Sequence, residues 1–184
     1  YGISRWLFGG ALDMLLREMT RPLVIVRAAA KPRQAVVEMR RILLPLDTTQ
    51  HSMHVPPAAL QLARNLGASV VLCHVVTPLG TYQDASQAPP GVARIIDELL
   101  DSARQFLDQA AVEARSEGVA VEVAVSMGQA APEIARLAER YDAGLIAMAT
   151  RGSGRLSRVL GSVAYAVAQH GRVPCLLTPS PNVN

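Results

Sequence analysis

Residues 41–47 read RILLPLD, a short apolar run that predicts a β-strand over Ile42–Leu46. A helix is predicted next, beginning at the proline pair 56–57, which a first helical turn tolerates, and ending at Gly67. A second strand is predicted over Val70–Val76. Strand, helix and strand in this order are typical of a βαβ unit in a parallel sheet.

The same alternation continues to the end of the chain. A proline-rich loop is predicted over Thr77–Pro90, followed by a long amphipathic helix that ends near Gly118. The remaining predicted elements are strands at Val119–Val125, Leu145–Met148 and Cys175–Thr178, with helices over 132–138 and 161–170. The sequence therefore predicts an α/β fold, a doubly wound five-stranded parallel sheet with helices on both faces. Ligands are expected at the carboxyl ends of its strands, near the switch in strand order.

The first residues of the chain resemble its last elements. Residues 3–10, ISRWLFGG, match residues 156–162, LSRVLGS, with one residue missing, and residues 21–26, RPLVIV, match residues 173–178, VPCLLT. Chance similarity is the alternative, but order, spacing and chemistry agree. We therefore predict a tandem arrangement with four segments: the last helix and strand of an incomplete upstream domain over 1–27, a linker over 28–40, a complete domain over 41–179 and a tail over 180–184.

Charge and hydropathy exclude several classes of protein. The net charge is +3, but residues 1–41 carry eight Arg or Lys against three Asp or Glu, while the remainder carries ten against twelve. This local excess, without interleaved aromatic residues, is interpreted as solvated surface, and no nucleic-acid partner is expected. The longest strand-like runs, such as Val70–Val76, fall far short of the roughly 20 residues of a membrane span, so no membrane association is expected.

The N-terminal residues and the cysteines predict a cytoplasmic location. Residues 1–16 have an apolar patch but neither a basic leader nor a cleavage site of small residues, so no signal peptide is expected. Cys73 and Cys175 lie in strand-like runs without metal-ligand spacing and are predicted to be buried, reduced thiols. His51 and His54 have i, i+3 spacing, but prolines follow them and no third ligand is near, so no metal site is expected.

An ordered set of short motifs carries a family resemblance. The set consists of residues 42–47 (ILLPLD), Ser52, residues 62–68 (LARNLGA), His74-Val75, Gly128-Gln129-Ala130, Asp142–Thr150 and Gly161-Ser162. In this order they resemble the universal stress protein family over essentially all of residues 39–179. The resemblance implies a Rossmann-like fold of the adenine nucleotide alpha hydrolase-like type.

A glycine-rich loop holds the phosphates of ATP in the nucleotide-binding branch of that family, with the pattern Gly, two residues, Gly, nine residues, Gly-Ser. Here the loop reads Ala149-Thr150-Arg151-Gly152, then eight residues, then Gly161-Ser162. Ala149 therefore replaces a glycine, and the loop is one residue short. The chemistry is retained in outline, because glycines let backbone amides converge on an anion and the start of a helix attracts phosphate.

The resemblance assigns residues to two parts of a nucleotide site. Ala149, Arg151, Gly152, Gly154, Gly161 and Ser162 would contact the phosphates of ATP or another adenine nucleotide, with or without Mg²⁺. Pro45, Asp47, Val75, Met148 and Val163 would surround the adenosine, with the Asp47 carboxylate accepting hydrogen bonds from the ribose or base.

Each assignment has a simpler structural alternative. Asp47 could cap the turn after its strand, and Ser162 could be an ordinary helix cap. Gly152 and Gly154 could be turn glycines. Val75 and Met148 could be plain core residues.

Three functions follow from these alternatives. The leading hypothesis is a stress-response protein whose regulatory state depends on bound adenine nucleotide. The second is a domain that has lost nucleotide binding and acts through dimerisation or a regulatory protein partner, which Ala149 and the shortened loop favour. An enzyme is disfavoured beyond weak ATPase activity, because no Asp or Glu lies between Ala149 and Ser162 to hold a metal ion at the phosphates.

The last strand suggests a homodimer or higher oligomer. In this family the last strands of two domains commonly pair antiparallel, which covers an exposed sheet edge. Residues 22–26 and 174–178 are the candidates for such pairing, within one chain or between neighbours.

Overall fold

The computed structural model describes residues 21–26, 39–47, 55–77, 85–149 and 161–179. These residues form a six-stranded sheet in the order β1-β6-β5-β2-β3-β4. Its strands are β1 (Leu23–Ile25), β2 (Arg41–Pro45), β3 (Ser69–Val76), β4 (Val121–Met127), β5 (Leu145–Ala149) and β6 (Cys175–Thr178). The five strands from β2 to β6 are parallel to one another, which confirms the predicted five-stranded parallel sheet.

The helices are α2 (Pro57–Leu66), α3 (Pro90–Ser116), α4 (Ala130–Arg140) and α5 (Ser162–His170), with a short 3₁₀ helix over Ala85–Gln87. Proline stands in the first turn of both α2 and α3, where a missing N–H costs no intrahelical hydrogen bond. At the end of α2, Gly67 adopts a left-handed conformation with φ 62°, as predicted for a helix stop.

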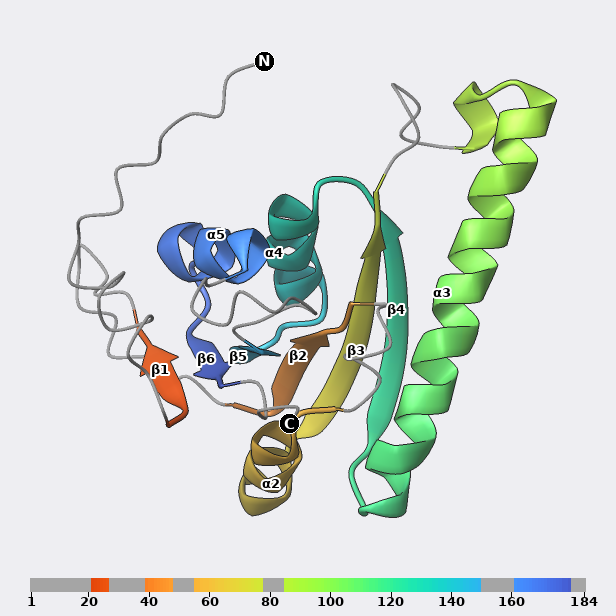
Figure 1. Cartoon of the computed structure of the whole chain (residues 1–184). Coiled ribbons are helices and arrows are strands. Elements are labelled where there is room, and N and C mark those ends of the chain that lie inside the picture. The colour runs from red at the N-terminus through yellow and green to blue at the C-terminus, as the bar shows by residue number, and fades with distance from the viewer. Residues whose placement is uncertain (1–20, 27–38, 48–54, 78–84, 150–160, 180–184) are drawn as a thin grey trace, which may run out of the picture.

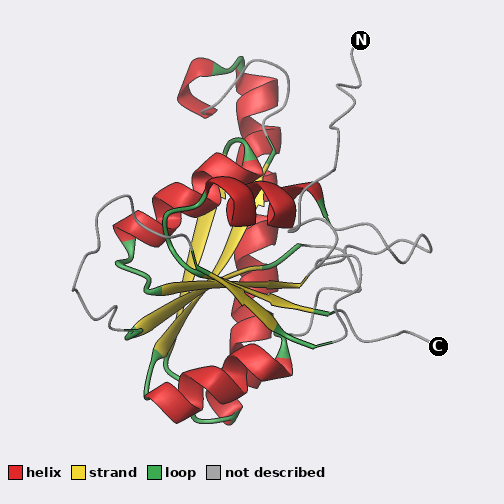
Figure 2. Cartoon of the chain, turned by 90° about the vertical axis from the view of Figure 1, so that its left-hand side faces the viewer, coloured by secondary structure: helices red, strands yellow, loops and turns green. Residues whose placement is uncertain are grey.

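Two apolar layers, one on each face of the sheet, hold the fold together. Side chains of α2 and α3 pack with Ile42, Leu44 and Leu72 on one face. Side chains of α4 and α5 pack with Leu43 and Val71 on the other. Alternate residues of the parallel strands thus face opposite layers, and Figures 1 and 2 show the sheet between its helices. The predicted doubly wound arrangement is confirmed.

The third predicted strand is displaced by two residues. It was expected over Val119–Val125 and is found as β4, Val121–Met127. The amide of Val119 donates to the carbonyl of Ala114, so Val119 belongs to the turn that ends α3. An apolar residue can close a helix as well as begin a strand, and the pattern of β-branched residues does not separate the two.

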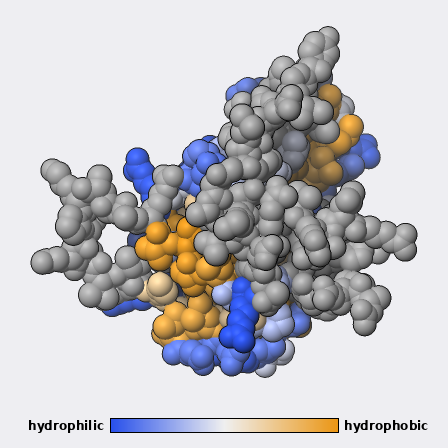
Figure 3. All heavy atoms as spheres, turned by 60° about the vertical axis from the view of Figure 1, so that its left-hand side comes forward, coloured by the Kyte–Doolittle hydropathy of each residue, from blue (hydrophilic) through white to orange (hydrophobic). Residues whose placement is uncertain are grey.

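An additional strand, β1, lies at the edge of the sheet, antiparallel to β6. Leu23 is level with Leu177 and Ile25 with Cys175, which confirms the predicted pairing of residues 22–26 with 174–178 within one chain. Val24 and Val26 remain exposed, and Figure 3, turned so that this side of the molecule comes forward, shows apolar surface on it. The helix predicted before this strand, like most of the linker, lies outside the described residues.

Both cysteines are free and buried, as predicted. Burial raises the pKa of the Cys175 thiol to about 12, because a thiolate would lose its hydration inside the core. The same cause raises the pKa of Cys73. Within the described ranges, no helix is both long and apolar enough to cross a membrane.

Candidate functional site

The strand order reverses at β2. From β2 the chain crosses to β3 and β4 on one side, and later to β5 and β6 on the other. The helices after these two neighbouring strands, α2 and α5, cover opposite faces of the sheet, so the carboxyl ends of β2 and β5 form the switch point at which open α/β sheets bind ligands. The candidate site is therefore at this edge, around Asp47 and Ala149.

Three of the predicted site residues at this edge are exposed. Asp47 follows β2, Ala149 ends β5 and Ser162 begins α5, and all three side chains are open to solvent. Ile42 is level with Leu145 across β2 and β5, so counting on from this register sets Leu46 level with Ala149. Asp47 and Ala149 thus lie at the carboxyl ends of two neighbouring parallel strands, and Ala149 begins the predicted phosphate loop.

The predicted adenosine contacts are less uniform. Pro45, Val75 and Val163 are partly buried, and Val75 and Val163 pack against the apolar layer of α4 and α5. Met148 is 7% exposed and belongs to that layer. The structure therefore places Met148 in the core, as the simpler alternative expected, whereas Pro45 and Val163 retain accessible surface.

Within the described residues, the first turn of α5 has no side-chain cap. Gly161 is the N-cap residue and Ser162 is the first helical residue, without a side-chain hydrogen bond capping the helix. The alternative role of Ser162 as the helix cap is wrong, because the N-cap position is held by Gly161 and Ser162 is already inside the helix. The N–H groups of this turn, with the positive end of the helix dipole, suit an anion.

Part of the predicted phosphate loop lies outside the described residues: Arg151, Gly152 and Gly154. The same holds for His51 and His54. Among the residues that are described, no group of three His, Cys, Asp or Glu side chains could hold a metal ion. The alternative role of Asp47 as a turn cap concerns residues 48–54, which also lie outside the described ranges.

A histidine that the site prediction omitted fastens the end of β2. The imidazole of His74, on β3, lies with Nδ1 2.8 Å from the carbonyl oxygen of Leu46. The amide of Leu46 donates to the carbonyl of Cys73 over 2.8 Å. The peptide groups just before Asp47 are thus held from β3 on both sides. In the sequence, His74 stands out as a polar residue within the apolar run of β3, which indicated that its side chain has a hydrogen-bond partner.

A buried carboxylate was also missed by the sequence analysis. Glu133 in the first turn of α4 is 5% exposed and accepts hydrogen bonds from the Ser126 hydroxyl, over 2.6 Å, and from the Arg136 guanidinium. Its side chain fills the space beside Gly128, where an added Cβ would lie 2.8 Å from the Glu133 Cγ. Glu133 shares a helical face with apolar Leu137, four residues on, and this spacing indicated that it points inward.

The comparisons with known proteins agree with this architecture. The model of the universal stress protein family matches residues 38–179. The chain belongs to the universal stress protein family. The universal stress protein MJ0531 of Methanocaldococcus jannaschii is 30% identical over 144 residues, which cover 77% of this chain and 83% of that protein. The predicted family is therefore confirmed.

Solved structures show the same universal stress protein fold. The structure of the protein MJ0577 superposes with a TM-score of 0.63 at 21% identity, covering 79% of this chain and 99% of that one. A universal stress protein in complex with cAMP has a TM-score of 0.54 at 21% identity, covering 78% and 98%. A universal stress protein of Archaeoglobus fulgidus in complex with dAMP has a TM-score of 0.50 at 20% identity, covering 75% and 96%.

Another universal stress protein of Archaeoglobus fulgidus differs in length. It superposes with a TM-score of 0.56 at 19% identity and covers 94% of this chain. The match spans only 54% of that longer chain.

Proposed function

We propose that this protein binds ATP or another adenine nucleotide at the carboxyl edge of its sheet and acts as a regulatory protein in a cytoplasmic stress response. The observation that carries the proposal is the exposed Asp47 carboxylate at the end of β2, beside the strand that leads to α5 and its uncapped first turn. The carboxylate accepts hydrogen bonds, and the amides of the first turn of α5 donate them to an anion. A nucleotide requires an acceptor for its ribose hydroxyls and donors for its phosphates.

The chemistry of these groups fits the two ends of a nucleotide. The Asp47 carboxylate would accept hydrogen bonds from ribose hydroxyls, and charge-assisted bonds of this kind are stronger than neutral ones. The amides of α5 would donate to phosphate oxygens. A Mg²⁺ ion bound with the nucleotide would neutralise phosphate charge. The family members that hold cAMP and dAMP support this class of ligand.

The proposed role is binding and not turnover. The loop between Ala149 and Ser162 contains arginines but no carboxylate that could bring a metal ion to the phosphates. We expect at most weak ATP hydrolysis, far below the roughly 1 s⁻¹ of ordinary enzymes. A steady-state phosphate-release assay with saturating ATP checks this, and turnover at ordinary enzyme rates would contradict it.

The nucleotide is best sought in the purified protein itself. The protein prepared without added nucleotide would be heat-denatured and its supernatant analysed by chromatography and mass spectrometry, in parallel with Gly161→Asp. The variant places a carboxylate at the N-cap of α5, where it would repel phosphate. Near-stoichiometric adenine nucleotide from the original protein and none from the variant is the expected result.

A matched control distinguishes an effect at the proposed site from a general effect of the added negative charge. Gly91 lies exposed in the first turn of α3 with nothing within 4 Å of an added Cβ, so Gly91→Asp adds the same charge at another helix start. We expect this variant to retain nucleotide. If the original protein releases none and titrated ATP produces no binding heat, the nucleotide-binding proposal fails.

The exposed methyl group of Ala149 favours a second candidate function. It stands where the binding branch of the family has glycine, and a Cβ there reduces how closely backbone can approach phosphate. In this case the domain would act without nucleotide, through dimerisation or a regulatory protein partner. Absence of nucleotide release together with a concentration-dependent dimer in light scattering would support this function over the first.

We further propose that residues 1–27 are the last helix and strand of an upstream universal stress domain, followed by a linker over 28–40, the complete domain over 41–179 and a tail. The antiparallel pairing of β1 with β6 supports this, because it covers an edge that would otherwise be open. The longer Archaeoglobus fulgidus chain, which matches 94% of this one over 54% of its length, is also consistent with a tandem arrangement.

Removing the proposed remnant tests its role as an edge cover. Residues 39–184 expressed alone would expose β6, and we expect its open edge to pair with a second copy, giving a homodimer or larger oligomer in light scattering. The full chain should stay at lower mass at the same concentration. Equal masses for both chains would contradict the proposed edge cover.

A further inference from the structure

His74 joins two strands at the place where their ladder ends. The last residue pair between β2 and β3 is Pro45 with Cys73, one residue before Leu46. Beyond it, the Leu46 amide donates to Cys73 and the Leu46 carbonyl lies 2.8 Å from the His74 ring. The imidazole therefore continues the attachment of β2 to β3 past the regular pairs.

The chemistry of the contact assigns the ring's donor. A backbone carbonyl only accepts hydrogen bonds, so Nδ1 of His74 carries the proton and donates it to Leu46. Leu46 itself is 8% exposed, so its carbonyl has little access to water as a replacement partner. Losing the imidazole donor would leave that carbonyl poorly satisfied and free the peptide group that joins Leu46 to Asp47.

We propose that His74 is a positioning residue for the nucleotide site, holding the Leu46 carbonyl so that the Asp47 carboxylate faces the ribose hydroxyls of the ligand. This assignment rests on the proposed nucleotide function. Asp47 is exposed and follows directly on the clamped peptide group, so its direction depends on that group more than on packing. His74 thereby determines how well the site distinguishes a ribose from a sugar without hydroxyls.

Two substitutions separate the donor from the bulk of the ring. His74→Asn keeps an N–H donor near the position of Nδ1, whereas His74→Leu keeps comparable volume and removes the donor. Calorimetric titration would measure the affinities of each protein for ATP and for 2′,3′-dideoxy-ATP. The original protein is expected to prefer ATP by at least about tenfold, the effect of one hydrogen bond to a charged group.

The ratio of the two affinities is the decisive readout. In His74→Leu the preference for ATP should fall to about twofold or less, with a smaller change for the dideoxy nucleotide, and His74→Asn should restore most of it. If the substitution merely disturbed the fold, the affinities for both nucleotides would fall by the same factor. An unchanged ratio in His74→Leu, or the same collapse in both variants, would overturn the proposal.

A measurement without ligand keeps this proposal separate from nucleotide binding. Amide hydrogen exchange of the peptide that spans residues 44–47 reports opening of the Leu46 contacts. His74→Leu should exchange there about fivefold faster than the original protein, and His74→Asn at nearly the original rate. If no protein binds nucleotide, the proposed function fails. Equal exchange in all three proteins would show that the clamp does not hold Leu46 and would overturn the positioning role by itself.

Discussion

The two edges of the sheet differ in the length of their connections. At the amino edge, helices return to strands through short turns: residues 67–68, 117–120, 141–144 and 171–174. At the carboxyl edge, three of the four connections from strand to helix are long: residues 46–56, 77–89 and 150–161. Short turns constrain the spacing of the elements that they join, whereas long connections are where proteins commonly carry binding residues.

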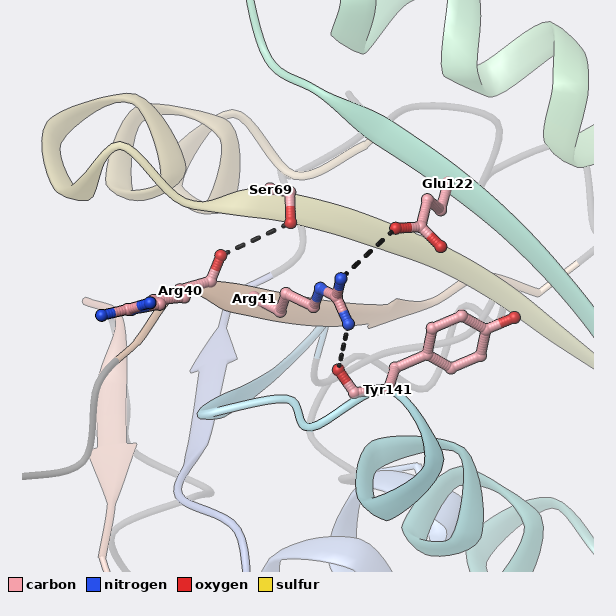
Figure 4. Close-up of polar contacts among 5 residues, drawn as sticks. All are labelled: Arg40, Arg41, Ser69, Glu122 and Tyr141. Carbon is pink, nitrogen blue, oxygen red and sulfur yellow. Dashed lines mark hydrogen bonds and ion pairs between the residues drawn. The ribbon is translucent and has the colours of Figure 1, made fainter. Parts of the chain in front are cut away.

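The amino edge is fastened by polar contacts within the chain (Figure 4). The Arg41 guanidinium donates to the Tyr141 carbonyl over 3.1 Å and lies 3.9 Å from the Glu122 carboxylate. The Ser69 hydroxyl donates to the Arg40 carbonyl over 3.4 Å. These bonds join the starts of β2, β3 and β4 to the end of α4. Groups used in this way hold the fold and do not face a ligand.

At the carboxyl edge, by contrast, the described residues include polar groups that are open to solvent. The Asp47 and Ser162 side chains face solvent, and the first turn of α5 has no side-chain cap. The contrast teaches that the contacts that hold the fold and the groups of the proposed binding site lie at opposite ends of the strands. Substitutions at the amino edge should therefore change the free energy of unfolding, and those at the carboxyl edge should change affinity.

The largest expected effect is at the amino edge, in Gly171→Ala. An added Cβ would lie 2.5 Å from the carbonyl oxygen of Val167, a backbone atom that cannot move without disturbing the end of α5. We expect a loss of about 3 kcal/mol in the free energy of unfolding, measured by urea denaturation. Gly91→Ala is the control, because an added Cβ there meets nothing within 4 Å, and it should be neutral or slightly stabilising. Equal behaviour of the two variants would contradict the steric argument.

The next effect is expected at the carboxyl edge, in Asp47→Asn. Replacing the carboxylate weakens charge-assisted hydrogen bonds to the ligand, and we expect ATP affinity to fall by about 2 kcal/mol. The free energy of unfolding should change by less than about 0.5 kcal/mol, because the side chain is exposed. Calorimetric titration and urea denaturation of the same samples check both values. A large loss of stability with unchanged affinity would reverse the assignment of this edge.

The smallest expected changes in unfolding free energy concern the two contacts of Arg41, with Tyr141 and with Glu122. Arg41→Met removes both the hydrogen bond to the Tyr141 carbonyl and the ion pair with Glu122, and it should cost about 1 kcal/mol of unfolding free energy. Glu122→Gln removes only an ion pair between half-exposed side chains and should cost about 0.3 kcal/mol. Urea denaturation measures both, and neither variant should change ATP affinity. Equal costs for the two variants would show that the ion pair, and not the backbone contact, fastens this edge.

The bounds of helices and strands were predicted correctly where a single local sequence feature specifies them. Gly67 ended a helix because it alone readily adopts the left-handed conformation found there. Cys175–Thr178 was predicted with its observed bounds, because the prolines at 174 and 179 delimit this short run. Val119 was misplaced, because its apolar side chain suits both a helix end and a strand start. Glu133 was missed, because its burial depends on Ser126 and Arg136 reaching it across a turn.

The sequence by itself determined the family, the order of strands and helices, and the residue types available for a site at the ends of β2 and β5. These features are local or periodic, so neighbouring residues suffice to specify them. Only the tertiary structure decided that β1 pairs with β6 of its own chain, that Met148 lies in the core and that the His74 ring holds Leu46. Such contacts join residues far apart in the chain, and their geometry depends on the twist and register of the whole sheet.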